Sequence, residues 1–389
     1  MRIGARNPAD YTGALVNEPP LSVGVRNPFV YAEHKLGEIN WNGMSPGKKR
    51  KKLEDAFDGK PYNQLFDSRN DSPLFVQTGD VRPCATVSNP TWGSIGSTYT
   101  DKTRAYDDPV QGDLPDCYFI AALSSIAFVG STTTETNLIL NQTGPNYSYS
   151  FWNPPSSAPV QDPQPVTITN KLPLDSTGKY RYSKSFTAGE IWVAMYEKAF
   201  AAWKKRSLED TPDYSLICTG DPVLALLNIT GWKYDQNTTH LTKSFGNGDL
   251  IYSKIDSVCQ NKVNPNPPPL TIYRTTLKPM VAYTYDPRIE TPPSGITYED
   301  ATIVANHAYS VLGVLTQGGN KYIVMRNPWG QKGAGPGFGD PDPTKLPLGA
   351  LASGKWYLVP ELSDPNDAVF ALKANVFKDY FKGFGWVTK

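Results

Sequence analysis

Apolar residues recur with a helical period in three stretches of the first 230 residues. Residues 117–129 carry an apolar face, which predicts a largely buried helix. A second helix is predicted behind Thr187-Ala-Gly-Glu190, which is typical of a capping box. One face of that helix would carry Trp192, Met195, Tyr196, Ala199, Phe200 and Trp203. A third helix is predicted from Asp221-Pro222, with aspartate as N-cap and proline in the first turn.

After about residue 230 the pattern changes to short apolar runs rich in β-branched and aromatic residues, which predict strands. These runs begin at Leu250, Leu270, Val281, Tyr309 and Tyr322, and an earlier one lies around Val166. We therefore expect an α+β protein in three parts. Residues 1–100 would form an N-terminal extension without a strong period, 101–220 a helical subdomain and 221–389 a β-rich subdomain.

Composition narrows the function only moderately. The chain has 389 residues, 39% of them hydrophobic, and a net charge of +1, which argues against a nucleic-acid partner on bulk charge. The basic run at 48–52 is interpreted as a solvated charge run. No apolar signal core opens the chain and no run reaches the roughly 18 apolar residues of a membrane span, so a cytoplasmic location is expected. Nothing in the sequence specifies an oligomeric state.

Cysteine usage points away from a disulfide framework. The four cysteines are Cys84, Cys117, Cys218 and Cys259, and they show neither CxxC spacing nor high density. Reduced thiols are therefore expected. Cys117 stands out, because it lies in the predicted first turn of a helix, where unpaired N–H groups and the helix dipole favour a thiolate. Gln111, six residues earlier, could add an amide donor beside the sulfur. A lone helix-start cysteine is, however, more often an inert buried thiol.

A base for Cys117 can be placed by hairpin geometry. Of the three histidines, His307 opens a predicted strand, and the next strand ends at Asn327-Pro328. The turn Thr316-Gln-Gly-Gly-Asn320 lies between them. With its centre near residue 318, cross-strand partners sum to about 636, so His307 would face residue 329, two places from Asn327. An asparagine that accepts from one imidazole nitrogen would fix the tautomer and orient the other nitrogen.

Three blocks of this sequence resemble the active-site blocks of the calpain family of cysteine proteases. They are Gln111-Gly-Asp-Leu-Pro-Asp-Cys117, His307-Ala-Tyr-Ser-Val and Arg326-Asn-Pro-Trp-Gly330. Further similarity lies at 191–200, 367–372 and 377–381, so the resemblance covers about residues 100–385. It implies a papain-like, two-lobed fold with a helical Cys-bearing lobe and an antiparallel β-rich His/Asn-bearing lobe.

The resemblance also implies a role for each residue in cutting protein or peptide substrates. Cys117 would be the nucleophile, His307 the base and Asn327 its orienter. Gln111 and the Cys117 N–H would hold the oxyanion. Trp329 would shield the His–Asn hydrogen bond, although an ordinary core tryptophan is an equally good interpretation. The sequence departs from the family at Pro115 and Asn306, where glycine is usual, and at Tyr118, where tryptophan is usual; none of these removes a catalytic group.

The same resemblance implies that calcium could regulate the protein, although the chemistry itself would not require it. Asp108 and Glu190 fall where acidic ligands of a first family site would lie, yet Glu190 is also explained by the capping box. At a second site the expected acids after Trp329-Gly330 are missing and Val369 replaces another, while Asp340 and Asp367 remain. We therefore expect weak or absent dependence on a second calcium. No EF-hand loop occurs in the sequence.

Two other functions remain open on the sequence alone. A transglutaminase-like acyl transferase would use cysteine and histidine in the same order, but its block sequences differ. A catalytically silent binding module is the second alternative, and the intact set of Cys117, His307, Asn327 and Gln111 argues against it.

Overall fold

The computed structural model describes residues 84, 90–94, 104–132, 140–143, 146–153, 163–187, 189–205, 210–233, 238–261, 272–287, 291–293, 296, 298, 303–317, 319–330, 357–358 and 368–389. Most of the predicted extension (1–100), the basic run at 48–52, Asp340 and Asp367 lie outside these residues. The described part combines helices with antiparallel sheets, so the α+β prediction is confirmed. None of the described helices is long and apolar enough to cross a membrane.

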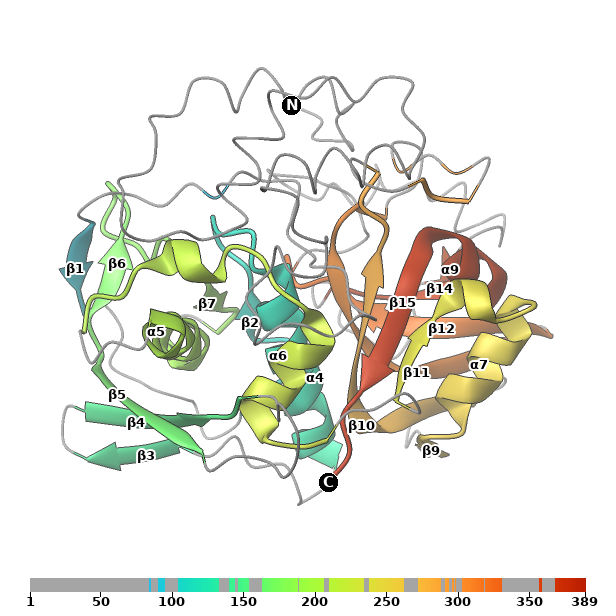
Figure 1. Ribbon diagram of the computed structural model, residues 1–389, viewed down its shortest axis with the longest axis horizontal. Coiled ribbons are helices and arrows are strands. Elements are labelled where there is room, and N and C mark those ends of the chain that lie inside the picture. The colour runs from blue at the N-terminus through green and yellow to red at the C-terminus, as the bar shows by residue number, and fades with distance from the viewer. Residues whose placement is uncertain are drawn as a thin grey trace, which may run out of the picture.

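One half of the molecule, which we call the cysteine half, is built on three helices and is drawn on the left of Figure 1. They are α4 (Cys117–Thr132), α5 (Trp192–Lys205) and α6 (Pro222–Thr230). Three small sheets and a 3-10 helix surround them: β1 (Thr91–Gly93) with β6 (Leu172–Leu174), β2 (Pro109–Val110) with β7 (Lys184–Ser185), β3 (Leu140–Thr143) with β4 (Asn146–Phe151) and β5 (Gln164–Thr169), and η2 (Tyr214–Ile217).

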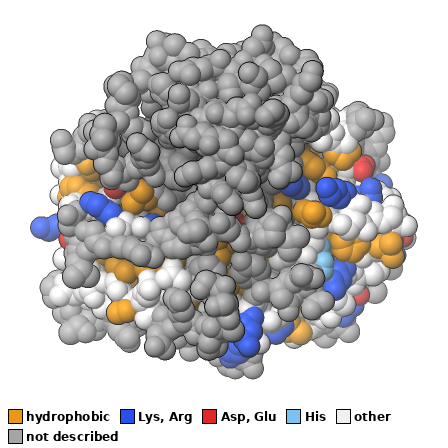
Figure 2. All heavy atoms as spheres, in the orientation of Figure 1, with side chains coloured by type: hydrophobic (Ala, Val, Ile, Leu, Met, Phe, Trp, Pro, Cys, Tyr) orange, Lys and Arg blue, Asp and Glu red, His pale blue; other side chains and the backbone are white. Residues whose placement is uncertain are grey.

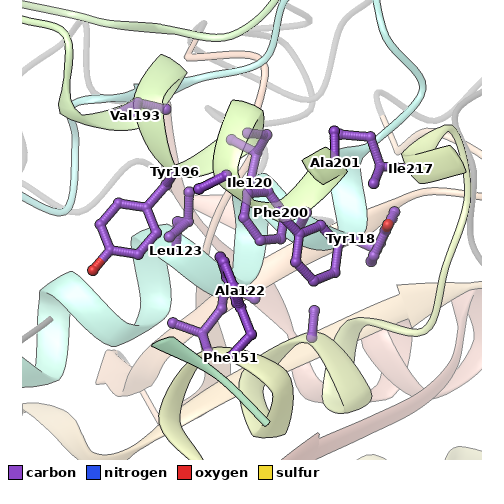
Figure 3. Close-up of a cluster of buried hydrophobic side chains, with 14 of the residues drawn as sticks. Tyr118, Ile120, Ala122, Leu123, Phe151, Val193, Tyr196, Phe200, Ala201 and Ile217 are labelled. Atoms are coloured by element: carbon purple, nitrogen blue, oxygen red, sulfur yellow. The ribbon is translucent and has the colours of Figure 1, made fainter. Parts of the chain in front are cut away.

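The three helices share one hydrophobic core, to which α4 contributes on more than one face. The Phe200 ring of α5 stacks on Phe119 of α4, with ring centroids 4.3 Å apart. Figure 3 shows Phe200 and Tyr196 reaching from α5 toward Tyr118 and Leu123 of α4. The buried residues of α6 belong to this same core. Helix α6 therefore packs with α4 and α5.

The three predicted helices are present, but one predicted start signal is not used. The Asp221 carboxylate accepts from the N–H groups of Val223 and Leu224, as an N-cap should. The predicted capping box at 187–190 is wrong, because α5 begins only at Trp192. The Thr187 hydroxyl instead donates to Oδ1 of Asp108, 3.0 Å away, so a long-range contact replaces the local cap.

The other half, the histidine half, is an eight-stranded antiparallel sheet on the right of Figure 1. Its order is β13-β14-β12-β11-β10-β15-β8, with β9 also paired to β10. The strands are β8 (Thr239–Leu241), β9 (Cys259–Asn261), β10 (Ile272–Thr284), β11 (Ala308–Gln317), β12 (Asn320–Arg326), β13 (Tyr357–Leu358), β14 (Val369–Lys373) and β15 (Phe381–Trp386). The helical elements of this half are η3 (Thr242–Ser244), α7 (Gly248–Asp256) and α9 (Ala374–Tyr380).

Two of the strand predictions need correction. The apolar run at Leu250 belongs to helix α7, whose N-cap Asn247 accepts from the Leu250 N–H. A short apolar run fits a buried strand and a buried helix equally well, and here the cap decides. The separate runs at Leu270 and Val281 predict two strands, but the described part of the first run (272–273) and Val281 both lie on the single long strand β10.

Polar contacts join the two halves along α4. Ser125 of α4 exchanges hydrogen bonds with the backbone of Met280 on β10, and Ser310 of β11 donates to the Ala121 carbonyl at 2.7 Å. Arg326, at the end of β12, is completely buried, and its guanidinium donates to the carbonyls of Asp107 and Pro109. Both carbonyls belong to the segment leading to Gln111, so Arg326 ties the histidine half to the loop before α4.

Two cysteines depart from the expectation of reduced thiols. Cys84 and Cys218 form a disulfide across a sequence separation of 134, with Cα atoms 5.6 Å apart. Cys117 and Cys259 are buried thiols outside any disulfide. The reason for the miss is physical: a pairing over this distance leaves no local spacing signal and is created only when the chain folds.

Candidate active site

Cys117 is the first residue of α4, as predicted. The carbonyl of Asp116 accepts from the N–H groups of Phe119, at 2.8 Å, and Ile120, at 3.2 Å. The helix therefore begins directly behind Asp116, and Cys117 lies in its first turn, at the positive end of the helix dipole. The sulfur takes part in no disulfide, and the residue is fully buried.

The loop before Cys117 is held tightly. The Gln111 side-chain nitrogen donates to the Leu114 carbonyl at 2.6 Å, and the Gln111 backbone N–H donates to the Pro328 carbonyl at 2.9 Å. A Cβ on Gly112 would come within 1.9 Å of the Tyr182 carbonyl oxygen, so only glycine fits there. The Gln111 side chain is therefore fixed within the loop that leads to Cys117.

His307 and Asn327 meet as the hairpin register predicts. Strands β11 and β12 pair Ser310 with Arg326 and Val311 with Met325, and both pairs sum to 636. Beyond Ser310 the strands lead back to His307 and Asn327, and His307 Nε2 lies 3.0 Å from Asn327 Oδ1. Both side chains are fully buried.

The hydrogen-bond network fixes which nitrogen of His307 can act as a base. Asn327 Oδ1 also accepts from the Trp329 backbone N–H at 3.1 Å, which identifies that atom as the amide oxygen. An oxygen can only accept, so His307 Nε2 must carry a proton and donate it. In the neutral ring the lone pair then lies on Nδ1.

Other residues hold the imidazole in its plane. The Trp329 ring lies 4.7 Å from the His307 ring between centroids, and the Tyr309 ring lies 4.9 Å away, edge to face. The His307 N–H donates to the Thr284 hydroxyl, and the Thr284 N–H donates to the His307 carbonyl. Trp329 is 7% exposed and its ring lies against His307, which fits a core residue, and its shielding of the His–Asn bond stays a prediction.

Helix α4 and strand β11 also run in the same direction where they pack against each other. Ala121, four residues after Cys117, accepts from Ser310, three residues after His307. Ser125, one turn further along α4, bonds Met280, which pairs with Val311. Because contacts advance together along α4 and β11, the start of α4 and the start of β11 lie at the same end. That end carries Cys117 and His307.

Sequence reasoning missed Arg326 and Thr284 as supports of this site. Arg326 belongs to the recognised block, and a charged residue that ends the apolar run Tyr322–Met325 was an available signal. Thr284 holds the backbone of His307 from the end of β10, and its distance of 23 residues along the chain gave no local clue.

The residue before His307 is Asn306, and its backbone conformation explains why asparagine is tolerated where glycine is usual. Its φ is +49°, in the left-handed region, which asparagine enters more readily than other side-chain-bearing residues. Its backbone N–H donates to the carbonyl of Tyr285, the residue after β10, at 2.8 Å. This hydrogen bond holds the conformation of Asn306.

Substitution at Asn306 should therefore separate backbone strain from side-chain chemistry. Asn306→Val is expected to cost about 1–2 kcal/mol of stability, because a β-branched residue resists positive φ, and to lower activity by displacing His307. Asn306→Gly is the matched control and should keep both. Urea unfolding and peptide hydrolysis measure the two effects, and equal behaviour of the two variants would contradict the strain argument.

Of the candidate calcium ligands, Asp108 is a poor match for a cation as its side chain lies. Its Oδ1 accepts from Thr187, and its Oδ2 accepts from the Ala105 N–H and the Trp192 indole at 3.1 Å each. These donors take up three of the roughly four lone-pair sites that the carboxylate could offer a metal. Glu190 is buried. Among the described residues no group of three His, Cys, Asp or Glu side chains could hold a metal ion.

A cysteine at a helix start, a histidine–asparagine pair on an adjoining antiparallel sheet and an α+β frame together define the papain-like class. The comparison with known families makes this specific. Residues 81–342 match the model described as calpain family cysteine protease, so the chain belongs to the calpain family.

Curated relatives agree at modest identity. A thiol protease from Porphyromonas gingivalis (strain ATCC BAA-308 / W83) is 27% identical over 248 residues, which are 61% of this chain and 46% of that protein. Calpain-7 from Sus scrofa is 26% identical over 257 residues, 64% of this chain and 27% of that protein. Calpain-type cysteine protease DEK1 from Arabidopsis thaliana is 25% identical over 295 residues, 71% of this chain and 12% of that protein. The matched part is thus less than half of each relative.

Proposed function

We propose that the chain is a calpain-like cysteine endopeptidase that cleaves protein substrates through an acyl-enzyme. The observation that carries the proposal is the bond from His307 Nε2–H to Asn327 Oδ1 at 3.0 Å, at the same end of the interface as Cys117. This bond leaves Nδ1 as the basic nitrogen for the thiol. The papain-like division into a Cys-bearing helical lobe and a His/Asn-bearing β lobe, implied by the family, corresponds to the two halves described above.

In the first step, His307 Nδ1 takes the proton of the Cys117 thiol, and Sγ attacks the carbonyl carbon of the scissile peptide bond. The carbonyl oxygen becomes an oxyanion. The Cys117 N–H and the side-chain amide of Gln111 would stabilise it, each by about 3–4 kcal/mol. His307 then gives its proton to the leaving amine, the C–N bond breaks and a thioester remains on Cys117.

In the second step, His307 accepts a proton from water, whose oxygen attacks the thioester. The C–S bond breaks, the carboxylic acid product leaves and Cys117 recovers its proton. Asn327 holds the imidazole tautomer throughout. None of these steps requires a metal, and calcium would enter only as a regulator through residues other than the Asp108 arrangement seen here. A cytoplasmic location is likewise part of this proposal.

The proposal favours protein or peptide substrates over other partners. On the face shown in Figure 2, the Lys and Arg side chains of the described residues are scattered rather than gathered into one basic field. A binding module without catalysis would not require the Nε2–H tautomer that Asn327 imposes. An acyl transferase remains the chemical alternative, because it differs only in whether water or an amine takes the acyl group.

One labelling experiment tests the proposal. We expect a thiol-directed peptide epoxide to attach one equivalent at Cys117, and we expect His307→Gln to abolish the adduct, because the reagent reports the activated thiol. Mass spectrometry locates the adduct, and a small alkylating reagent serves in parallel because Cys117 is fully buried. Casein cleavage against incorporation of a labelled amine separates the protease from the acyl transferase.

Both arms of the experiment are run with calcium and with chelator. A chain that is never labelled under either condition would be the binding module, and the protease proposal would fail. Labelling with amine incorporation and no casein cleavage would replace the protease by the acyl transferase.

A further inference from the structure

A pair of buried acids lies directly behind the candidate nucleophile. Asp116 precedes Cys117 and is fully buried, and Glu197, in the middle of α5, is 1% exposed. Helix α5 packs closely on α4, which begins directly after Asp116, and Figure 3 shows Phe200 of α5 among the side chains of this core. Two carboxyl groups out of reach of solvent are costly unless they are paired or protonated, so their presence calls for a physical explanation.

The hydrogen bonds of Glu197 supply one. The Ser183 backbone N–H lies 3.1 Å from both carboxylate oxygens of Glu197. Asp116 lies beside it, because Phe119 and Phe200, three residues after Asp116 and Glu197, stack with ring centroids 4.3 Å apart, and the two carboxyl groups interact directly. Two carboxylates are both acceptors and cannot share a hydrogen bond, so this contact requires one proton on the pair.

Electrostatics points the same way. Burial first, and then the negative charge of Asp116, raise the pKa of Glu197 well above its usual range. Because the two carboxyls interact strongly, the shift belongs to the pair rather than to one residue.

The other groups facing the pair do not compete for this proton. Tyr118 of α4 has its pKa raised by burial and by the charges of Asp116, Cys117 and Glu197. Tyr214 of η2 has its pKa raised by burial and by Glu197, Tyr182, Asp116 and Asp210. Both phenols therefore stay neutral while the acids titrate. Lys198, the neighbour of Glu197, directs its ammonium away to Asp210 at 2.7 Å.

We propose that Asp116 and Glu197 form a one-proton pair that positions the first turn of α4, and with it Cys117, for catalysis. This inference rests on the proposed function only for its link to catalysis. The pair itself rests on the contacts described above. The shared proton ties Asp116 to α5, and the Asp116 carbonyl in turn caps the N–H groups of Phe119 and Ile120. Loss of the proton would set two negative charges against each other beside the sulfur.

The direction of the pH effect follows from linkage. The folded pKa of the pair is raised above its unfolded value, so its contribution to stability is complete at acidic pH and is lost as pH rises through the folded pKa. Between the unfolded and the folded pKa the folding equilibrium should fall by up to about tenfold per pH unit from this pair alone, and above the folded pKa the effect levels off. The alkaline limb of activity should fall with it.

The test uses Glu197→Gln, which imitates the protonated pair. The glutamine oxygen can accept from Ser183 and its NH₂ can donate to Asp116, so the net charge equals that of the one-proton pair. We expect wild type to lose far more thermal stability than Glu197→Gln between pH 6 and pH 9, and the alkaline limb of kcat/KM for a fluorogenic peptide to move to higher pH in the variant. Asp249→Asn, an exposed acid on α7, is the matched control and should follow wild type.

Infrared spectroscopy of the wild type supplies a second readout that needs no stable variant. We expect a carbonyl band of protonated carboxylic acids at pH 7 that weakens in Glu197→Gln and in Asp116→Asn; Asp221, whose pKa burial raises to about 8, contributes to this band in all three proteins. A band of unchanged intensity in both variants, or parallel pH profiles for wild type and Glu197→Gln, would overturn the pair. Because infrared bands and melting temperatures do not require proteolysis, the pair can hold even if the protease proposal fails.

Discussion

Replacing His307 by glutamine is expected to lower kcat for peptide hydrolysis by on the order of 10⁵- to 10⁶-fold, as loss of the base does in comparable triads. Glutamine cannot take the thiol proton, and it cannot return a proton to the leaving amine. The substitution is close in size, so the folded state should persist even though His307 is completely buried. Single-turnover kinetics and thermal melting separate the two effects.

The neighbouring residues give a graded series. Cys117→Ala should match His307→Gln, and the double variant should be no slower than either single variant, because the two residues act as one unit. Asn327→Ala should cost less, on the order of 10⁴-fold, since it frees the imidazole to choose the wrong tautomer without removing it. Asn327→Ala also leaves the Trp329 N–H without its acceptor, so its melting temperature must be measured beside wild type.

Additive losses in the double variant would contradict this arrangement, because they would mean that the sulfur and the imidazole serve separate reactions. A His307→Gln variant that kept substantial hydrolysis would remove His307 from the role of base. In either case the remaining described histidine, His240, would be the next residue to test as a base. It lies among Phe245, Phe384 and Trp386 on β8, three strands away from β11 in the sheet.

Local signals in the sequence are enough to predict much of the candidate site. The Asp221 cap, the helical period after Cys117 and the hairpin arithmetic each depend on residues close together in sequence, and each is confirmed by the fold. The hairpin is the most informative of these signals, because the register of two paired strands tells directly which residues are neighbours.

What escaped prediction was set by contacts between distant segments. Thr187 bonds Asp108 across 79 residues instead of capping α5, and Glu197 interacts with Asp116, which lies just before α4. Arg326 reaches carbonyls more than 200 residues away in sequence, at a separation of 217 for Pro109. Such contacts depend on how the halves pack, which periodicity and cap rules do not encode.

Removing the Cys84–Cys218 disulfide is expected to lower the free energy of unfolding by about 5 kcal/mol, the loop-entropy value for a closed loop of this size. The bond spans a separation of 134 residues, so it restricts the unfolded chain strongly. Its folded-state effect is local as well. A Cβ at Gly220, two residues after Cys218, would come within 2.4 Å of the Tyr118 ring, so this loop packs directly behind the residue that follows Cys117.

The matched comparison is wild type against Cys84→Ala/Cys218→Ala, each with and without dithiothreitol. The reductant should destabilise wild type toward the double variant and leave the double variant unchanged, and unreduced wild type should show two thiols after denaturation rather than four. Four thiols, or a melting temperature indifferent to reductant, would disprove the bond. The count also bears on location: disulfides persist in oxidising compartments. Protein taken from its own cells with the pair reduced would fit the expected cytoplasm, whereas an oxidised pair would place the working enzyme outside it.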